Sequence, residues 1–240
     1  MAVSDGAMDR VEVRDGLAAA VREAGALALQ TFRGQLKSWI KGKSSPVSEA
    51  DLAVDALLRE RLLTILDAGW LSEETEDDPA RLQRADVWVV DPIDGTRAYL
   101  AGLPDWAISV ALVNAGRPVV AALYAPVTDE LFLSITGTGA TLNGAPIKAS
   151  KGDQIADAKF SGPKRRLESL ATIEPAIQTM PRVPSLALRL ARRWRRARDA
   201  VRAMELSASS ELPARSWPGS RAGAWDRKIS PLRSGHPRSH

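Results

Sequence analysis

Two aspartates stand three positions apart in the stretch VVDPIDGT, which covers residues 89–96. Asp91 and Asp94 follow an apolar run, and no histidine or lysine lies near them in the sequence to neutralise their charge. Hard oxygen ligands of this kind suit Mg²⁺, which keeps several waters and completes its coordination shell with substrate phosphate. Gly95 allows close approach of the backbone, and a helix that begins at Thr96 would present amide groups to phosphate oxygens. The stretch therefore suggests a combined metal and phosphate site.

A simpler interpretation of Asp-x-x-Asp stays open. Asp94 could cap a helix and Asp91 could lie in a solvated turn, because aspartate is common at both kinds of position. The upstream residues Ser72, Glu73 and Glu74 favour the metal site, since they add carboxylates that could bind two or three Mg²⁺ ions together with the two aspartates. Taken alone, the two glutamates would again indicate only a solvated loop.

The elements that must position these acids begin with two amphipathic helices. Apolar residues at helical spacing predict a first helix over residues 14–32, which Gly34 can terminate. After a polar loop, KGKSSPVSEAD, Ser48 can cap a second helix and place Asp51 in its first turn. The apolar stripes are Leu17, Val21, Ala24 and Ala28 in the first helix, and Val54, Leu57, Leu58, Leu62 and Ile65 in the second.

Strands follow the two helices. The run VWVV (87–90) predicts a short buried strand whose exit is DPIDGT, and the acidic segment SEETEDDPA before it is too polar for a core. A tight hairpin turn is predicted at Asn143-Gly144. Three further strands are predicted from the segments AISVALV, PVVAALY and ELFLSI. Two helices followed by an antiparallel sheet indicate the α+β class.

Composition argues against several kinds of chemistry. The 240 residues include no cysteine, and the two histidines lie among the last five residues, so disulfides, thiolate metal sites and a histidine triad are not expected. No apolar run approaches eighteen residues, and the first ten residues show no basic and apolar leader, so a cytoplasmic protein without a membrane span is expected. The chemistry must therefore rest on oxygen ligands.

Charge divides the chain at residue 188. Residues 1–188 carry 20 basic and 25 acidic side chains, whereas residues 189–240 carry 13 and 4, which leaves a tail with a net charge of +9. From Leu186 onward the sequence is helical by propensity but carries arginines on nearly every face, so no buried stripe is expected. We expect three parts: an N-terminal α+β metal-binding lobe (1–150), the start of a C-terminal α/β lobe (151–190), and an atypical, poorly ordered basic tail (191–240).

The combination of SEE (72–74) with DPIDGT resembles the motifs of the inositol monophosphatase superfamily, whose members are magnesium-dependent, lithium-sensitive phosphatases. The resemblance covers about residues 14–190, and it implies the layered αβαβα fold of the sugar phosphatases with an incomplete C-terminal lobe. The acidic stretch is most similar to bacterial 3'(2'),5'-bisphosphate nucleotidases, which clear the adenosine bisphosphate left by sulfate assimilation. Supporting matches are Lys43, PVSEAD (46–51), DELF (129–132) and LNG (142–144).

The resemblance implies a set of metal ligands. Glu73, Asp91 and the carbonyl of Ile93 would hold a first Mg²⁺, Asp91 and Asp94 would share a second, and Glu73 could support a third. In the family a late Trp-Asp motif completes the second metal site, and the matching aspartate here is Asp226. Arg-Lys-Ile-Ser follows it instead of an alanine-rich helix, and only fourteen residues remain, so the sequence departs from the family pattern here.

The resemblance also implies catalytic and substrate contacts. Thr96 and Asp51 would orient a metal-bound water as the nucleophile, with Glu73 supporting catalysis through its metal. Asp94, Gly95 and Thr96 would contact the substrate. Asp51 has a plainer interpretation as well, because an acid in the first turn of a helix is favoured by the helix dipole.

The tail limits how far these expectations extend. After PSLAL (184–188), which still resembles the family, the chain turns arginine-rich, as translation of a GC-rich gene in a shifted frame would produce. The expected activity is Mg²⁺-dependent hydrolysis of a small phosphate monoester, with adenosine 3',5'-bisphosphate ahead of inositol monophosphate; a catalytically impaired remnant is the alternative. Nucleic acid binding by the tail is disfavoured, because the tail has no recognisable reading motif. Family members commonly form dimers, so a homodimer is one expected arrangement.

Overall fold

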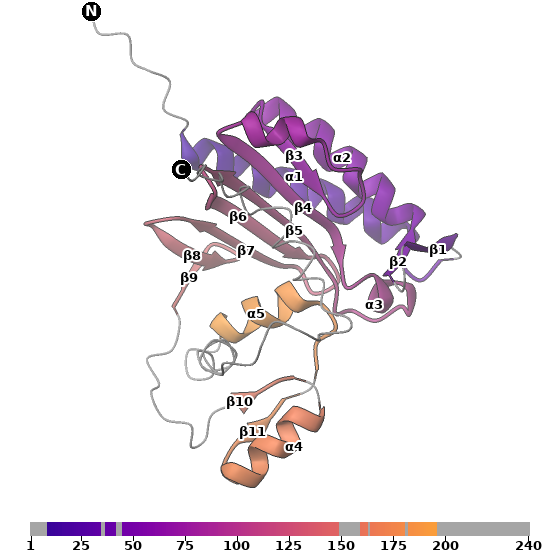
Figure 1. Ribbon diagram of the computed structural model, residues 1–240, viewed down its shortest axis with the longest axis vertical. Helices are drawn as coiled ribbons and strands as arrows, with labels where there is room; N and C mark the ends of the chain where they lie inside the picture. Colours follow the sequence, from indigo (N-terminus) through magenta and orange to yellow (C-terminus); the bar gives the residue numbers. More distant parts are fainter. Residues whose placement is uncertain are drawn as a thin grey trace, which may run out of the picture. The chain divides into compact units, whose positions relative to one another are not determined.

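The computed structural model describes residues 9–34, 37–41, 45–148, 159–162, 164–180 and 182–195. The chain divides into two units, Met1–Ala203 and Met204–His240, and every described residue belongs to the first unit. In that unit, helices accompany a large central sheet (Figure 1). Two residues of the predicted pattern, Lys43 and Asp226, lie outside the described residues.

The described part of the chain alternates helices and strands. Its helices are α1 (Arg10–Thr31), α2 (Glu49–Ile65), α3 (Thr96–Leu100), α4 (Lys164–Ile173) and α5 (Leu186–Arg195), with a 3-10 helix η1 (Pro79–Gln83). Its strands are β1 (Ser38–Lys41), β2 (Ser45–Ser48), β3 (Gly69–Ser72), β4 (Asp86–Asp94), β5 (Ala107–Asn114), β6 (Arg117–Ala125), β7 (Glu130–Ile135), β8 (Gly139–Leu142), β9 (Ala145–Ile147), β10 (Lys159–Phe160) and β11 (Gln178–Thr179).

The first two helices confirm the apolar periodicity. α1 begins at Arg10 rather than at residue 14, because the carboxylate of Asp9 accepts a hydrogen bond from the Val11 backbone amide at 2.8 Å and caps the helix. α2 follows Ser48 as predicted, with Asp51 in its first turn. The predicted stripes are buried at Leu17, Val21, Ala24, Ala28, Val54, Leu58 and Leu62, and partly buried at Leu57 and Ile65.

The central sheet has the order β3-β4-β5-β6-β7-β8-β9. The four predicted strands, β4 to β7, pair antiparallel as expected. β8 and β9 continue this pattern, whereas β3, which was not predicted, pairs in parallel with β4 and makes the sheet mixed. Sequence patterning missed β3, because its four residues GWLS run directly into the acidic segment. It also missed the β1–β2 hairpin, which occupies the polar loop before α2. The α+β class is confirmed.

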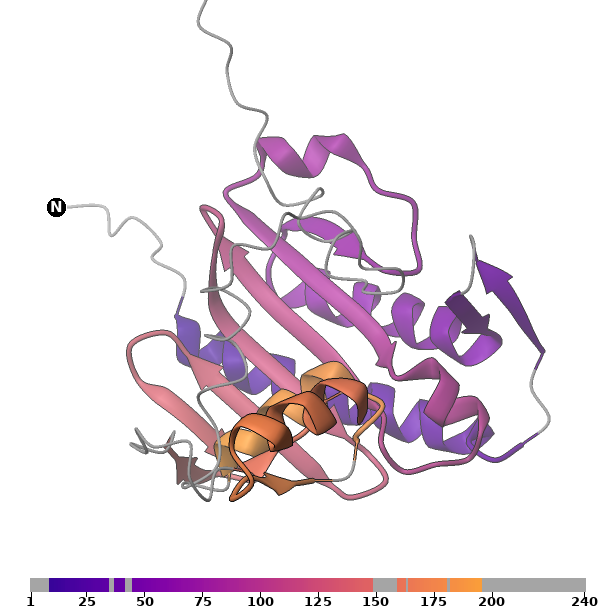
Figure 2. The ribbon, with the colours of Figure 1, turned by 60° about the horizontal axis from the view of Figure 1, so that its bottom comes forward.

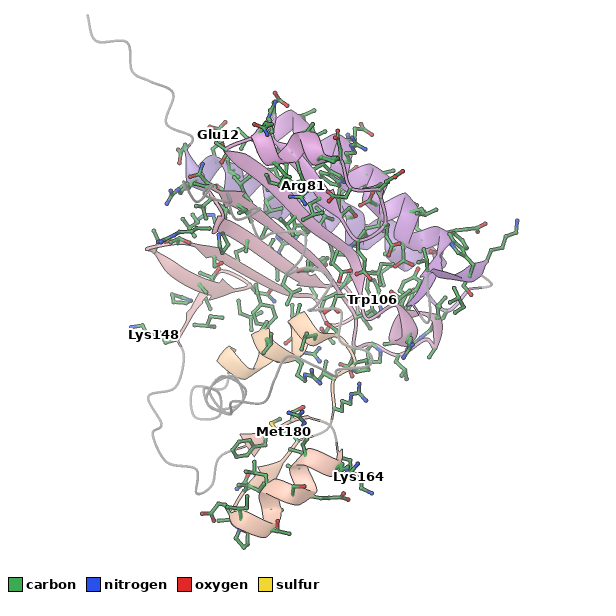
Figure 3. All side chains as sticks on the ribbon, viewed as in Figure 1. Glu12, Arg81, Trp106, Lys148, Lys164 and Met180 are labelled. Carbon is green, nitrogen blue, oxygen red and sulfur yellow. The ribbon has the colours of Figure 1, made fainter. Side chains whose placement is uncertain are left out.

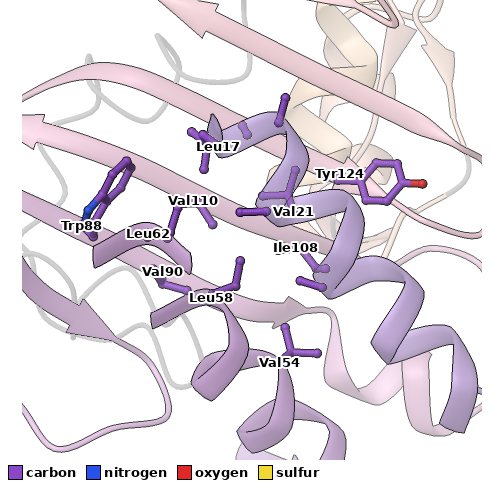
Figure 4. Packing of buried hydrophobic residues seen from close by; sticks show 14 of the residues in the cluster. Leu17, Val21, Val54, Leu58, Leu62, Trp88, Val90, Ile108, Val110 and Tyr124 are labelled. Carbon is purple, nitrogen blue, oxygen red and sulfur yellow. The ribbon is translucent and has the colours of Figure 1, made fainter. Parts of the chain in front are cut away.

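The two faces of the sheet are covered by different helices. α1 and α2 pack against one face, where Leu17, Leu58, Trp88 and Val110 belong to the main hydrophobic cluster (Figure 4). α5 lies on the other face of the sheet (Figure 2). There a smaller cluster gathers Ala107, Leu123, Ala125 and Phe132 around Leu188 of α5. Successive strand residues point to opposite faces, so one set of strands supports both clusters.

The arginine-rich segment differs from its prediction. Leu188 of α5 is fully buried, although no buried stripe was expected for this segment. The helix continues to Arg195, past residue 190, after which the poorly ordered tail was predicted to begin. Ala187 and Ala191 pack against the same cluster as Leu188, and Arg192 adds hydrogen bonds to Glu130 and Asp105.

The segment before α5 contains a small parallel unit. β10 pairs in parallel with β11 across α4, with Lys159 opposite Gln178 and Phe160 opposite Thr179. The expected start of an α/β lobe between residues 151 and 190 stays a prediction, as do the boundaries of the three parts. Among the described residues, no helix is long and apolar enough to cross a membrane.

The two fully buried tryptophans of the sheet region allow a matched test of an unsatisfied donor. The Nε1 atom of Trp88 donates to the Leu66 carbonyl at 3.2 Å, whereas that of Trp106 (Figure 3) has no hydrogen-bond partner among the described residues. Trp106 instead contacts the rings of Tyr99 and Phe32, at centroid distances of 4.9 and 5.6 Å. A buried unpaired donor costs about 1–3 kcal/mol.

We therefore expect Trp106→Phe to lower the free energy of unfolding by less than Trp88→Phe does, by at least ~1 kcal/mol. Both changes remove the same atoms from a fully buried site, but only Trp88→Phe breaks a hydrogen bond. Urea unfolding followed by circular dichroism measures both values. Equal losses would show that the Trp106 donor is satisfied in solution.

Candidate active site

Asp91 and Asp94 lie on β4 itself, so the prediction that the strand ends at residue 90 and that DPIDGT forms its exit is wrong. β4 pairs with β5 up to Asp91 opposite Ser109, and after an irregularity Asp94 pairs with Ala107. Proline cannot donate to a strand ladder, so Pro92 falls where the register shifts. The turn comes one residue later, at Gly95 (φ 102°), which is the N-cap of α3. The predicted helix start at Thr96 is confirmed.

Parallel pairing of β3 with β4 brings the predicted glutamate to the first aspartate. Ser72 is opposite Val90, and the Glu73 backbone amide donates to the Val90 carbonyl at 3.1 Å. Glu73 therefore follows the end of β3 at the level where Asp91 follows Val90. Because the carboxyl ends of parallel strands meet at one edge of a sheet, the two acids lie at the same edge.

Asp51, Thr96 and the Ile93 carbonyl form a second group, whose members the resemblance implied in separate roles. Thr96 Oγ1 donates to the Ile93 carbonyl at 3.1 Å and lies 3.4 Å from Asp51 Oδ1. Asp51 Oδ2 accepts from the Ser48 backbone amide at 2.8 Å and from Ser48 Oγ at 2.6 Å. The predicted helix-start role of Asp51 and its contact with Thr96 therefore coexist, one on each carboxylate oxygen.

Burial sets the electrostatics of this second group. The side chains of Asp51 and Thr96 are each 1% exposed. Desolvation raises the pKa of Asp51 above its ordinary value, and the hydrogen bonds from Ser48 and Thr96 lower it by less. A carboxylate with a raised pKa is a better proton acceptor at neutral pH than an exposed one.

Asp94 is turned toward a part of the chain far away in the sequence. Its Oδ2 accepts from Ser185 Oγ at 2.6 Å and from the Ala187 backbone amide at 2.7 Å. The simpler interpretation, in which Asp94 caps a helix, is thus realised at α5 and not at the adjacent α3. Ser185 was not foreseen as a functional residue, because nothing in its local sequence marks a partner 91 positions away.

A buried relay behind Glu73 was also missed. Asp55, on α2, is 3% exposed and accepts a short hydrogen bond from Ser72 Oγ. Ser72 Oγ in turn accepts from the Glu74 backbone amide at 3.2 Å. The relay fixes the start of the acidic segment against α2. One signal was present in the sequence, because Asp55 lies one helical turn after Asp51 and so shares its face.

The residue types at this edge of the sheet fit Mg²⁺, whereas the arrangement of the described side chains fits it only in part. The edge formed by β3 and β4 offers carboxylates at Glu73 and Asp91 and the carbonyl of Ile93, all of them hard oxygen ligands. Across the residues that the structure describes, however, no three acidic side chains form a ready metal-binding group. Asp226, the remaining predicted ligand, lies outside the described residues.

Comparison with known proteins gives consistent matches. The inositol-1-monophosphatase of Rhizobium meliloti (strain 1021) is 38% identical over 120 residues, which are 50% of this chain and 45% of that protein. The histidinol-phosphatase of Chlorobaculum parvum is 34% identical over 130 residues, 53% of this chain and 49% of that protein. The chain thus spans about half the length of the curated relatives it matches.

Solved structures and a family model extend the match. The extragenic suppressor protein suhB from Bartonella henselae superimposes with a TM-score of 0.67 at 27% identity, covering 75% of this chain and 73% of that one. The sequence model of the inositol monophosphatase family matches residues 9–197, which include β3, β4, α3 and α5 and reach beyond the arginines of α5. The chain belongs to the inositol monophosphatase family.

Proposed function

We propose that this chain is a Mg²⁺-dependent phosphatase that hydrolyses a small phosphate monoester. The observation that carries the proposal is the buried group of Asp51, Thr96 and the Ile93 carbonyl, placed directly after the β4 edge where Glu73 lies beside Asp91. A proton acceptor, a hydroxyl and hard oxygen ligands on neighbouring strand ends are the parts that metal-assisted hydrolysis needs. Family membership supports the same reaction.

The described residues would bind the cation and move the proton of the attacking water. Glu73, Asp91, the Ile93 carbonyl and Asp94 would hold Mg²⁺, which when bound supplies positive charge for the phosphate oxygens. Asp51 would act through the Thr96 hydroxyl, which would turn from the Ile93 carbonyl to Asp51 Oδ1, 3.4 Å away. The hydroxyl would pass its proton to Asp51 and take the proton of the attacking water. The raised pKa of Asp51 favours this role at neutral pH. The number of ions, two or three, and a ligand role for Asp226 stay predictions.

For the substrate we propose a 3'(2'),5'-bisphosphate nucleotide, as adenosine 3',5'-bisphosphate, hydrolysed to AMP. The proposal rests on the resemblance of the acidic stretch. The names of the curated relatives support the alternatives instead, inositol monophosphate and histidinol phosphate. Contacts of Gly95 and Thr96 with substrate, a cytoplasmic location with a part in sulfate assimilation, and a homodimer stay predictions.

The experiment measures phosphate release by the full chain from these three esters, with Mg²⁺ and after its removal by EDTA. Release is expected only with Mg²⁺, and it should be fastest on the nucleotide. Asp94→Asn should lose most of the phosphate release, because asparagine lacks the negative charge that binds a cation. Asp78→Asn is the matched control. Asp78 lies in the acidic segment before β4, where its carboxylate caps η1 by accepting from the Ala80 amide.

The outcomes separate the alternatives. Full activity of Asp94→Asn, or release that persists in EDTA, would contradict the assignment. Faster release from inositol monophosphate or histidinol phosphate would keep the reaction and replace the substrate. A folded protein that takes up Mg²⁺ but releases no phosphate from any ester would identify the impaired remnant, for which the short match to the relatives is the motivating observation.

A further inference from the structure

One carboxylate of the candidate site also holds a helix. Asp94 Oδ2 accepts from Ser185 Oγ and from the Ala187 backbone amide, and Ser185 Oγ accepts from the Leu188 backbone amide at 3.0 Å. These hydrogen bonds satisfy amide groups of the first turn of α5, which lack partners within the helix. Asp94 and Ser185 therefore cap α5 together.

Arg192 fastens the next turn of α5 to the sheet. Its Nη1 donates to Asp105 Oδ1 at 2.7 Å, its Nε donates to Glu130 Oε2 at 2.8 Å, and its Nη2 donates to Thr128 Oγ1 at 3.2 Å. The Glu130 side chain is 9% exposed and that of Arg192 is 25% exposed, so these ion pairs are shielded from water more than most. Arginine can serve several acceptors at once because its guanidinium group has five N–H donors in a fixed plane.

Asp105 connects these two attachments. Its carboxylate accepts from Arg192, and its backbone carbonyl accepts from the Ser185 amide at 3.3 Å. Gly95 lies against both Asp105 and Ser185. A Cβ atom on Gly95 would come within 3.2 Å of the Asp105 carbonyl oxygen and 3.3 Å of Ser185 Cβ. The end of β4 and the start of α5 are therefore in close contact at Gly95.

We propose that Ser185 and Arg192 are positioning residues, which fix the carboxylate of Asp94 through α5, so that docking of α5 and cation affinity at Asp94 are coupled. The inference rests on the proposed function. Hydrogen bonds to Oδ2 do not compete with a cation at Oδ1, because a carboxylate has about four acceptor sites on its two oxygens. They orient the group, and partners that orient a metal ligand raise its affinity. The coupling is therefore positive.

Binding of Mg²⁺ to the protein without substrate tests this proposal by calorimetry. Ser185→Ala should raise the dissociation constant about 10- to 100-fold, and Arg192→Met should raise it about fivefold or more. Arg61→Met is the matched control, because Arg61 also bonds two carboxylates, Glu23 and Glu60, but joins α1 to α2. A merely structural role would lower the melting temperature of the two test variants and leave their Mg²⁺ affinity unchanged.

Hydrogen exchange on the unmodified protein gives a second readout that needs no destabilising change. Coupling is reciprocal, so Mg²⁺ must stabilise the docked state of α5 by the factor that docking adds to Mg²⁺ affinity. Exchange of the Ala187 and Leu188 amides should slow on addition of Mg²⁺, and this slowing should vanish in Asp94→Asn. Exchange that stays the same or speeds up would overturn the proposal while Mg²⁺ uptake by the unmodified protein still supported the phosphatase. No uptake by the unmodified protein would overturn both.

Discussion

Replacing Asp51 with asparagine is expected to slow phosphate release about 10²- to 10⁴-fold, the usual contribution of a general base. The asparagine side chain would keep the size of the aspartate, and its amide oxygen could still accept from Ser48. It could not accept a proton from water through Thr96, whose Oγ1 lies 3.4 Å from Asp51 Oδ1. The effect should fall on kcat, because Asp51 is 1% exposed and cannot itself reach much of the substrate.

The same change is expected to stabilise the protein near neutral pH in the absence of ligand. Burial raises the pKa of Asp51, so the folded state holds its proton at pH values where the unfolded chain has lost it. This contribution to stability is fully present below the ordinary pKa of 3.8 and is lost as pH rises through the folded pKa. At neutral pH the wild-type protein therefore buries a charge at a cost, which asparagine avoids.

Steady-state kinetics and denaturant unfolding at several pH values check both statements. The stability gain of Asp51→Asn should grow as pH rises above 3.8 and disappear below it. Glu49→Gln is a suitable control, since Glu49 is an exposed acid in the same first turn and faces Lys37 at 3.9 Å. Unchanged kcat in Asp51→Asn would remove Asp51 from the catalytic role, whatever the stability result.

Gly95→Ala is expected to lower the free energy of unfolding by about 1–3 kcal/mol, the usual cost of an unfavourable backbone conformation. Gly95 has a φ of 102°, which residues with a side chain rarely adopt, and the new Cβ would press on Asp105 and Ser185. Any relief moves Asp94 or Thr96, which flank it. A displacement of about 1 Å at such a site can cost about 10²-fold in rate.

Gly116→Ala separates backbone strain from close packing. Gly116 also has a positive φ, 77°, but lies in the β5–β6 turn, and a Cβ there would meet nothing within 4 Å. The Gly116→Ala variant should lose about 1 kcal/mol of stability and keep full activity. Thermal unfolding and phosphate release of the two variants make the comparison. If Gly95→Ala retains the normal rate of phosphate release, the packing of α5 against the end of β4 does not control catalysis.

Several features of the protein follow from local sequence alone. The stripes of α1 and α2 predict buried faces because helical spacing places residues three and four apart on one side. Ser48 and Asp51 are three positions apart, so a helix start brings them together without help from the rest of the fold. The chemical character of the site is also local, since the residue types Glu73, Asp91 and Asp94 already specify hard oxygen ligands.

Where those ligands point was decided by the tertiary structure. Glu73 lies beside Asp91 because β3 pairs with β4 in one particular register, and β3 is too short to show a period of its own. Asp94 faces α5 because Leu188 and Arg192 dock that helix on the far face of the sheet. Spacing along the chain carries no information about partners 91 and 93 positions apart. Local residue types thus determined which atoms can bind a cation, whereas packing between distant segments decided how they are held.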